Sequence, residues 1–167
     1  MDGFDYSAFT LYLAKIIENE FNLSVYQMIR SACNIPMPQC YNKLWKGDSG
    51  IKSINLETGY GKIVNVNEPK KVNRRVVGLR TRPLGDLLVL YQNLENYNNR
   101  NVVNKTKIIP LSKAIERFLE GFKDYRNDCA HMNRYTKEQY EQSRVLFEEF
   151  MKDFLPILAE IKEKLSK

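Results

Sequence analysis

The sequence predicts an all-α protein, a helical bundle of about five helices with a small inserted β-hairpin or β-like loop. Three observations lead to this class. Apolar residues recur at spacings of three and four over most of the chain, which is the period of an amphipathic helix. The last thirty residues or so carry the longest such pattern. Alternating residues and clustered glycines are confined to residues 47–80. We therefore expect a single domain, residues 1–167, with an insert at 47–80.

The first helix is expected at residues 7–21, with Ser7 as its N-cap, and the second at residues 24–32. Proline cannot continue a helix, so Pro36 and Pro38 end the second one, and residues 41–45 would add one more turn. The expected inward stripes are Phe9, Tyr12, Leu13 and Ile16 in the first helix, and Val25, Met28 and Ile29 in the second.

The insert carries most of the positive charge of the chain. Alternation in residues 51–56 and 62–66 indicates extended strands, and residues 74–77 form a possible third strand. From Lys62 to Arg82, seven cationic side chains face one acid, Glu68, so this segment alone accounts for the formal net charge of +6. A concentrated basic segment suits a polyanion such as RNA, and a solvated hairpin that binds nothing is the alternative. The residues expected to contact RNA are Lys70, Lys71, Arg74, Arg75, Arg80 and Arg82.

Three more helices complete the expected bundle. One covers residues 81–97, with Pro83 at its first position and Leu84, Leu87, Leu88, Tyr91 and Leu94 inward. Another opens at Pro110 and Ser112, with Ile115, Phe118, Leu119 and Phe122 on one face. The last begins at a capping box formed by Thr136 and Gln139, and Pro156 should kink it. Its apolar face, widened by Leu146 and Ile157, would serve a bundle core or a contact with a second copy.

The composition excludes several classes of protein. No apolar run is long enough to cross a membrane, and the acidic start of the chain does not resemble a signal segment, so we expect a cytoplasmic location. Cys33, Cys40 and Cys129 have neither disulfide nor metal-motif spacing, and the chain has one histidine. We expect no metal and no cofactor.

Residues 125–131 combine that histidine with an arginine on an apolar face. At 100° per residue from Ile115, Arg126 falls at about 20°, the centre of the face, and His131 at about 160°. The helix must end before the capping box, so His131 should lie in its last turn or just beyond. A guanidinium near a core is costly unless it is paired or faces a polar cavity. A polar cleft at this helix end satisfies both residues, and an Arg–Glu pair with a surface histidine is the simpler alternative.

Arginine and histidine together suit one reaction class, the self-cleavage of RNA through its 2′-hydroxyl. Histidine exchanges protons near neutral pH, and arginine binds phosphate oxygens through two parallel hydrogen bonds. The reaction needs both an acid and a base, while one chain supplies one histidine. Two copies meeting at the site would supply two.

The run Arg126-Asn127-Asp128-Cys129-Ala130-His131 resembles the Arg-Asn-x-x-x-His signature of HEPN-domain ribonucleases, as do the helices that flank it. The resemblance implies a helical bundle, a homodimer with a composite cleft, and metal-independent RNA cleavage. It implies that Arg126 binds the scissile phosphate, His131 exchanges protons and Asn127 orients the site or contacts RNA. It also implies a supporting acid, Glu18 or Glu20, and an antitoxin or other regulatory protein as partner.

The sequence departs from the family at two points. In one subgroup an antitoxin modifies a tyrosine two residues after the histidine, and this chain has Asn133 there. The insert at 47–80 is also additional to a minimal family domain. A non-catalytic dimerisation or RNA-binding module of a larger assembly therefore stays open beside the enzyme. A sensor that binds a nucleotide is a weaker third possibility, because Gly59-Tyr60-Gly61 is too short for a phosphate loop.

Overall fold

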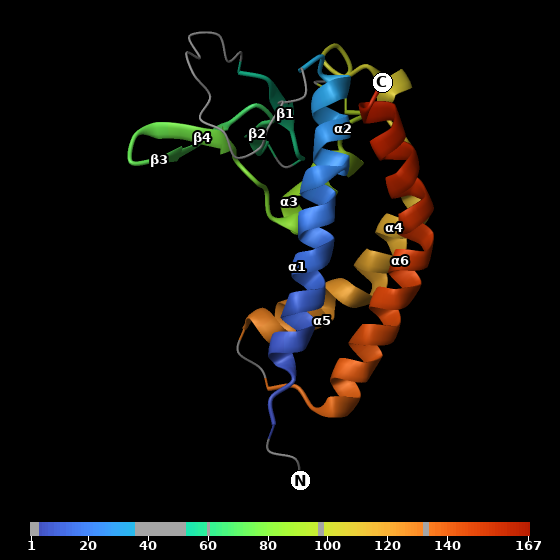
Figure 1. The fold of residues 1–167 in the computed structure, drawn as a ribbon. Coiled ribbons are helices and arrows are strands. Elements are labelled where there is room, and N and C mark those ends of the chain that lie inside the picture. The colour runs from blue at the N-terminus through green and yellow to red at the C-terminus, as the bar shows by residue number, and fades with distance from the viewer. Residues whose placement is uncertain (1–3, 36–52, 60, 97–98, 132–133) are drawn as a thin grey trace. The chain divides into compact units, whose positions relative to one another are not determined.

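The computed structural model describes residues 4–35, 53–59, 61–96, 99–131 and 134–167 (Figure 1). The expected fold class is confirmed, since the described chain is mainly helical with small antiparallel β-hairpins. The turn expected at residues 41–45, like Pro36, Pro38 and Cys40, lies outside the described residues. The elements in order are α1 (Ser7–Leu23), α2 (Val25–Ala32), β1 (Asn55–Glu57), β2 (Ile63–Asn65), β3 (Pro69–Val72), β4 (Arg75–Leu79), α3 (Leu84–Gln92), α4 (Ser112–Arg117), α5 (Lys123–Ala130) and α6 (Lys137–Leu165).

The chain forms two compact units. The first comprises residues 1–20 and 110–163, and the second comprises residues 21–109 and 164–167. The first unit holds most of α1 and α6 with α4 and α5, and the second holds α2, α3 and both hairpins. The expectation of a single domain stays a prediction. None of the described helices has both the length and the apolar composition that a bilayer crossing requires.

In the first unit, α1 buries Thr10, Ala14 and Ile17. The expected stripe was wrong at two of its four positions, because Phe9 and Tyr12 are 47% and 68% exposed, while Leu13 and Ile16 are half-buried. The apolar pattern predicted a buried face of α1 that is rotated about the helix axis from the face that is buried, Thr10, Ala14 and Ile17. Thr10 is a polar residue on this buried face. Its hydroxyl is hydrogen-bonded to the Ser143 hydroxyl, at 2.9 Å, so it can be buried without losing a hydrogen-bond partner.

Three consecutive elements, α4, a π-helical turn (Phe118–Phe122) and α5, form one helical segment of the first unit. Ile115, Phe118 and Phe122 are buried, as expected, while the Leu119 side chain lies outside the described ones. Phe118 meets Phe150 of α6 edge to face, with ring centroids 5.6 Å apart. The π turn was not foreseen from the sequence.

A glycine within the π turn allows close packing against α6. A Cβ atom at Gly121 would lie 3.0 Å from Cδ1 of Leu146, which is tighter than an ordinary van der Waals contact. The absence of a side chain at Gly121 therefore lets Leu146 approach the turn closely.

Helix α6 begins as its capping box predicts. The Thr136 hydroxyl accepts a hydrogen bond from the Gln139 N–H, at 3.2 Å, and the Gln139 side chain accepts one from the Thr136 N–H, at 3.0 Å. The helix continues through Pro156. Its fully buried side chains lie at helical spacing, while Leu146 and Ile157 are half-buried. The buried residues of α6 are Ser143, Phe150, Phe154, Leu158 and Ile161.

The second unit contains a polar cluster within its core. Arg30 of α2 is 1% exposed, and its guanidinium donates to the side-chain oxygens of Gln27, at 2.8 Å, and Asn67, at 3.0 Å. The apolar residues expected inward from α2 and α3 are buried, apart from the half-buried Tyr91. Pro83 lies just before α3, one position earlier than expected. Helix α3 ends at Gln92, well short of the expected residue 97.

The insert consists of two hairpins rather than one. Strand β1 pairs with β2, and β3 pairs with β4 through a register that shifts between Lys70 and Lys71. Two residues, Asn73 and Arg74, connect β3 to β4, with φ angles of 48° and 65°. Positive φ at both positions is the geometry of a type I′ turn, which favours asparagine but penalises arginine at the second position.

Candidate active site at the end of α5

The Arg–His motif lies at the C-terminal end of α5. The helix ends at Ala130, and His131 follows it directly, with its backbone N–H donating to the carbonyl oxygens of Asn127, at 3.0 Å, and Asp128, at 3.2 Å. The expectation that His131 lies in or just beyond the last turn is confirmed. Its imidazole is exposed, so it is accessible to a substrate.

Arg126 is half-buried, and not at the centre of a buried face as the helical wheel predicted. The segment before Arg126 contains a π turn, and an i→i+5 turn holds one residue more than an α turn, so the regular wheel does not describe the positions beyond it. The buried position of α5 near this end is taken by Cys129, which is 4% exposed.

Asn127 holds the guanidinium of Arg126 through a hydrogen bond from Nη1 to Oδ1, at 3.0 Å. Among the described side chains, no carboxylate lies within ion-pair distance of Arg126. The amide positions the guanidinium without neutralising it, so its charge stays available to an anion. The simpler alternative of an Arg–Glu pair is therefore not what the described residues form.

Tyr135 is hydrogen-bonded to the first residue of the motif segment, Tyr125. The Tyr135 side chain is buried and its hydroxyl donates to the Tyr125 carbonyl oxygen, at 3.1 Å. Burial raises the pKa of the Tyr135 phenol and of the neighbouring Cys129 thiol, so both groups keep their protons at neutral pH. Cys129 is a packing residue here, since a protonated buried thiol is a poor nucleophile.

Asp5 ties the segment after the motif to the start of α1. Its Oδ1 accepts hydrogen bonds from the backbone N–H groups of Ser7, at 3.0 Å, and Tyr135, at 3.1 Å, while the Tyr6 N–H donates to the Tyr135 carbonyl at 3.0 Å. The N–H of Ser7, then that of Tyr135, lowers the pKa of the Asp5 carboxyl. We call this arrangement the Asp5 clamp.

Sequence reasoning missed the clamp because it assigned the capping role to Ser7, which is instead the first residue of α1. The available signal was an aspartate two positions before a helix, a residue type that bonds to backbone N–H groups nearby. Nothing in the sequence indicated that the same carboxylate also bonds to residue 135.

Both candidate supporting acids have cationic partners outside the motif. Glu18 pairs with Lys15, one turn earlier on α1, and Glu20 pairs with Lys162 of α6 at 3.0 Å. The assignment of either carboxylate to the Arg–His site stays a prediction.

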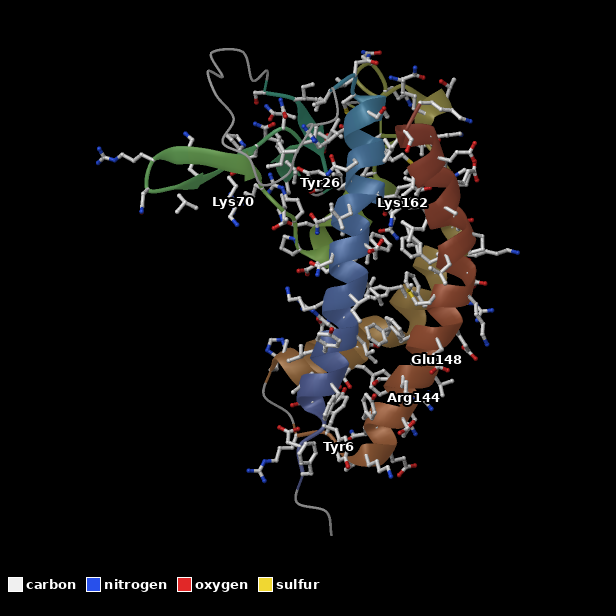
Figure 2. The ribbon with its side chains drawn as sticks, viewed as in Figure 1. Tyr6, Tyr26, Lys70, Arg144, Glu148 and Lys162 are labelled. Atoms are coloured by element: carbon white, nitrogen blue, oxygen red, sulfur yellow. The ribbon has the colours of Figure 1, made fainter. Side chains whose placement is uncertain are left out.

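The basic residues of the insert belong to the second unit. Lys70, Lys71, Arg74 and Arg80 are exposed, and Arg82 is half-buried. Figure 2 labels Lys70 on the β3–β4 hairpin, whose side chains extend away from the ribbon on both sides. The Arg75 side chain lies outside the described residues. A hollow of about 530 Å³ is lined by Glu68, Pro69, Lys70, Lys71, Arg80 and Thr81.

Glu68 engages two of these cations. Its two carboxylate oxygens pair with Arg80 and Arg82, and the Arg82 guanidinium also donates to the Asn65 carbonyl at 2.9 Å. The hydrogen bond from Arg80, with the charges of both arginines, lowers the pKa of Glu68. Arg80 and Arg82 therefore brace the base of the hairpin, while Lys70, Lys71 and Arg74 are the cations it presents to solvent.

A scan against protein-family models and searches among curated proteins and solved structures returned no match for this chain. The likeness to HEPN-domain ribonucleases accordingly rests on the residues from Arg126 to His131 and on the helices around them.

Proposed function

We propose that this protein is an endoribonuclease that cleaves RNA without a metal ion, using Arg126 and His131 from two copies of the chain. One observation supports the proposal above the others. An exposed imidazole follows the end of α5, five residues after a guanidinium whose described partner is an amide and not a carboxylate. A histidine and a charged arginine free to bind a phosphate are the groups that the reaction requires.

The proposed chemistry is an in-line transfer within the RNA chain. A neutral imidazole takes the proton of the ribose 2′-hydroxyl as the 2′ oxygen bonds to the adjacent phosphorus. The bond from phosphorus to the 5′ oxygen breaks, and a protonated imidazole gives that oxygen its proton. The products are a 2′,3′-cyclic phosphate and a 5′-hydroxyl. Arg126, oriented by Asn127, binds the phosphate oxygens and stabilises the charge that develops on them.

Two copies of the chain would supply the acid and the base. The reaction needs both an acid and a base, whereas one chain supplies a single histidine. A homodimer with both motifs at one cleft would provide two imidazoles and two guanidiniums. A cytoplasmic toxin or antiviral-defence effector, controlled by an antitoxin or other regulatory protein, is the role that we propose for such an enzyme.

The decisive experiment compares the wild-type protein with His131→Ala and Arg126→Ala on labelled RNA. His131 is exposed, so its removal should leave stability unchanged while cleavage slows by about 100-fold or more. Lys137→Ala, a change of an exposed cation in the first turn of α6, is the matched control. A chelator should have no effect, and the products should end in 2′,3′-cyclic phosphate. Equal cleavage rates for the wild type and His131→Ala would exclude the proposal.

The exposed cations of the β3–β4 hairpin favour a second candidate, a non-catalytic RNA-binding module. Lys70, Lys71 and Arg74 present positive charge without a described acidic partner. Binding through these cations alone would weaken steeply with salt, because it releases counterions from RNA. Purified protein that binds RNA in this salt-dependent way but never cleaves it would support this candidate over the enzyme.

A further inference from the structure

Four aromatic rings from two distant parts of the chain meet in the first unit. Phe4 and Tyr6 lead into α1, Phe9 lies in its first turn, and Tyr140 lies near the start of α6. The centroids of Phe4 and Tyr6 are 4.8 Å apart, those of Phe9 and Tyr140 are 5.6 Å apart, and Tyr6 stacks on Tyr140 at 5.9 Å. We call these four residues the aromatic platform. Figure 2 labels Tyr6, at this end of the unit.

The platform is partly exposed to solvent although its rings contact one another. Phe4 is 57% exposed and Phe9 is 47% exposed, while Tyr6 and Tyr140 are half-buried. Tyr12, about one turn along α1 from Phe9, is 68% exposed. Large rings that are exposed but fixed by ring contacts present flat faces at little further cost in conformational entropy.

The platform is tied to the chain that carries the motif. Tyr6 donates its backbone N–H to Tyr135, and the Asp5 clamp bonds to Tyr135 from the neighbouring position. Tyr135 in turn bonds to Tyr125 of α5, one residue before Arg126. Arg134, which is exposed, places a cation beside the Asp5 carboxylate. Hydrogen bonds thus join the segment that carries Tyr6 to Tyr125, the residue before Arg126.

We infer that the aromatic platform binds unpaired nucleobases by stacking, which makes single-stranded RNA the substrate class of this protein. This inference rests on the proposed function, because it takes the Arg–His motif of the same unit as the place where the bound RNA is cleaved. Stacking on aromatic rings is tolerant of base identity, and positive charge nearby binds the connecting phosphates. In a duplex the base faces are covered by their neighbours, so the platform selects loops and single strands.

The chemistry of the surface favours bases over an apolar protein partner. All four platform side chains are aromatic, whereas the exposed aliphatic residues of α6, Val145 and Leu155, follow Tyr140 by more than one helical turn. Arg126, whose described partner is an amide, supplies a cation in the same unit as the platform.

The test measures binding separately from cleavage. A single-stranded RNA whose 2′-hydroxyls are methylated cannot be cut, and its affinity is read by fluorescence anisotropy. The double variant Phe4→Ala/Phe9→Ala should bind it about tenfold or more weakly, since stacking contributes roughly 1–3 kcal/mol per base. The control Val145→Ala/Leu155→Ala removes exposed apolar surface of similar exposure in the same unit and should bind like the wild type. Affinity for duplex RNA should be nearly unchanged in both variants.

A second variant keeps the test informative if the double alanine variant folds poorly. Phe9→Trp enlarges the ring and adds an indole to a chain that otherwise contains one tryptophan. The fluorescence of this added indole should be quenched on titration with the single strand and not with the duplex. Unchanged single-strand affinity of the alanine variant, no quenching in the Phe9→Trp variant, or loss of self-association in place of RNA binding would each overturn the inference. Single-strand binding without cleavage by the wild type would uphold the platform and reject the enzyme.

Discussion

At the scale of single residues, the most informative contact is the one between Arg126 and Asn127. A carboxylate partner would neutralise the guanidinium and satisfy its donors, and would leave little of it for a substrate. An amide oxygen occupies one donor and fixes the orientation while the positive charge persists. The neighbouring Cys129 and Tyr135, whose pKa values burial raises, contribute packing and hydrogen bonding rather than charge.

The Asp5 clamp should make the segment after the motif sensitive to acid. Because hydrogen bonds lower the pKa of Asp5 in the folded protein, its stabilisation is present above the ordinary value of 3.8 and is lost as the pH falls through the lowered pKa. Amide hydrogen exchange at Tyr135, corrected for intrinsic rates, should therefore lose protection below pH 3.8. Asp5→Asn keeps an acceptor oxygen that does not titrate, so its protection should vary less with pH, and Asp5→Ala should lack protection already at neutral pH. Wild-type protection that is constant through this range would contradict the role given to the carboxylate.

At the scale of elements, one substitution in the β3–β4 hairpin should change the stability of the protein and its affinity for RNA in opposite directions. Arg74 has a φ of 65°, a conformation that costs a non-glycine residue on the order of 1 kcal/mol. Arg74→Gly would give an Asn-Gly turn, the preferred type I′ pair, so the hairpin should become more stable by about 0.5–1 kcal/mol. The same change removes one exposed cation, so the slope of log affinity for single-stranded RNA against log salt should fall by about 0.7.

Denaturant unfolding and binding at several salt concentrations would check both effects of Arg74→Gly. Lys105→Ala, which removes an exposed cation that pairs with Glu95 in the same unit, is the control. A variant that is more stable and binds RNA with an unchanged slope would remove Arg74 from the RNA-contacting set. A variant that is less stable would show that the arginine side chain makes a contact stronger than the strain.

Elements with local chemical signals were predictable, and elements decided by packing were not. The capping box at Thr136 consists of side chains that bond to their own backbone, and its position requires α5 to end before it. The buried face of α1 depends on the Thr10–Ser143 hydrogen bond, which joins residues 133 positions apart, and no local pattern contains it. The π turn before Arg126 likewise has no signal in the local apolar pattern. The candidate site was therefore predictable in composition and position, but not in the orientation of its arginine or in the Asp5 clamp behind it.

At the scale of the whole molecule, the two units divide the observations that bear on RNA. The motif, the Asp5 clamp and the aromatic platform belong to the first unit, and the basic hairpins belong to the second. The first unit has an aromatic core in which Phe118, Phe150 and Phe154 are nearly or fully buried. Rigid packing of this kind within the unit suits a site that must hold two side chains in defined positions.

The proposed composite site predicts how activity depends on the proportion of wild-type chains. If each site needs His131 from both copies, co-folding wild type with His131→Ala should reduce cleavage as the square of the wild-type fraction. Half wild-type chains should then give about a quarter of the activity, whereas a site within one chain should give about half. Co-folding with Lys137→Ala should leave the rate unchanged, and a linear dependence in the His131→Ala mixture would rule out a site that needs both copies.

The π turn at Phe118–Phe122 also defines what a single-codon deletion would do to this protein. Loss of one residue there would let the segment close into a uniform helix, shorten it by about 1.5 Å and swing Arg126 through roughly a quarter of a revolution. The guanidinium would then leave the direction that it takes in this structure. The activity of the proposed enzyme would thus depend on the number of residues in the turn as well as on their identity.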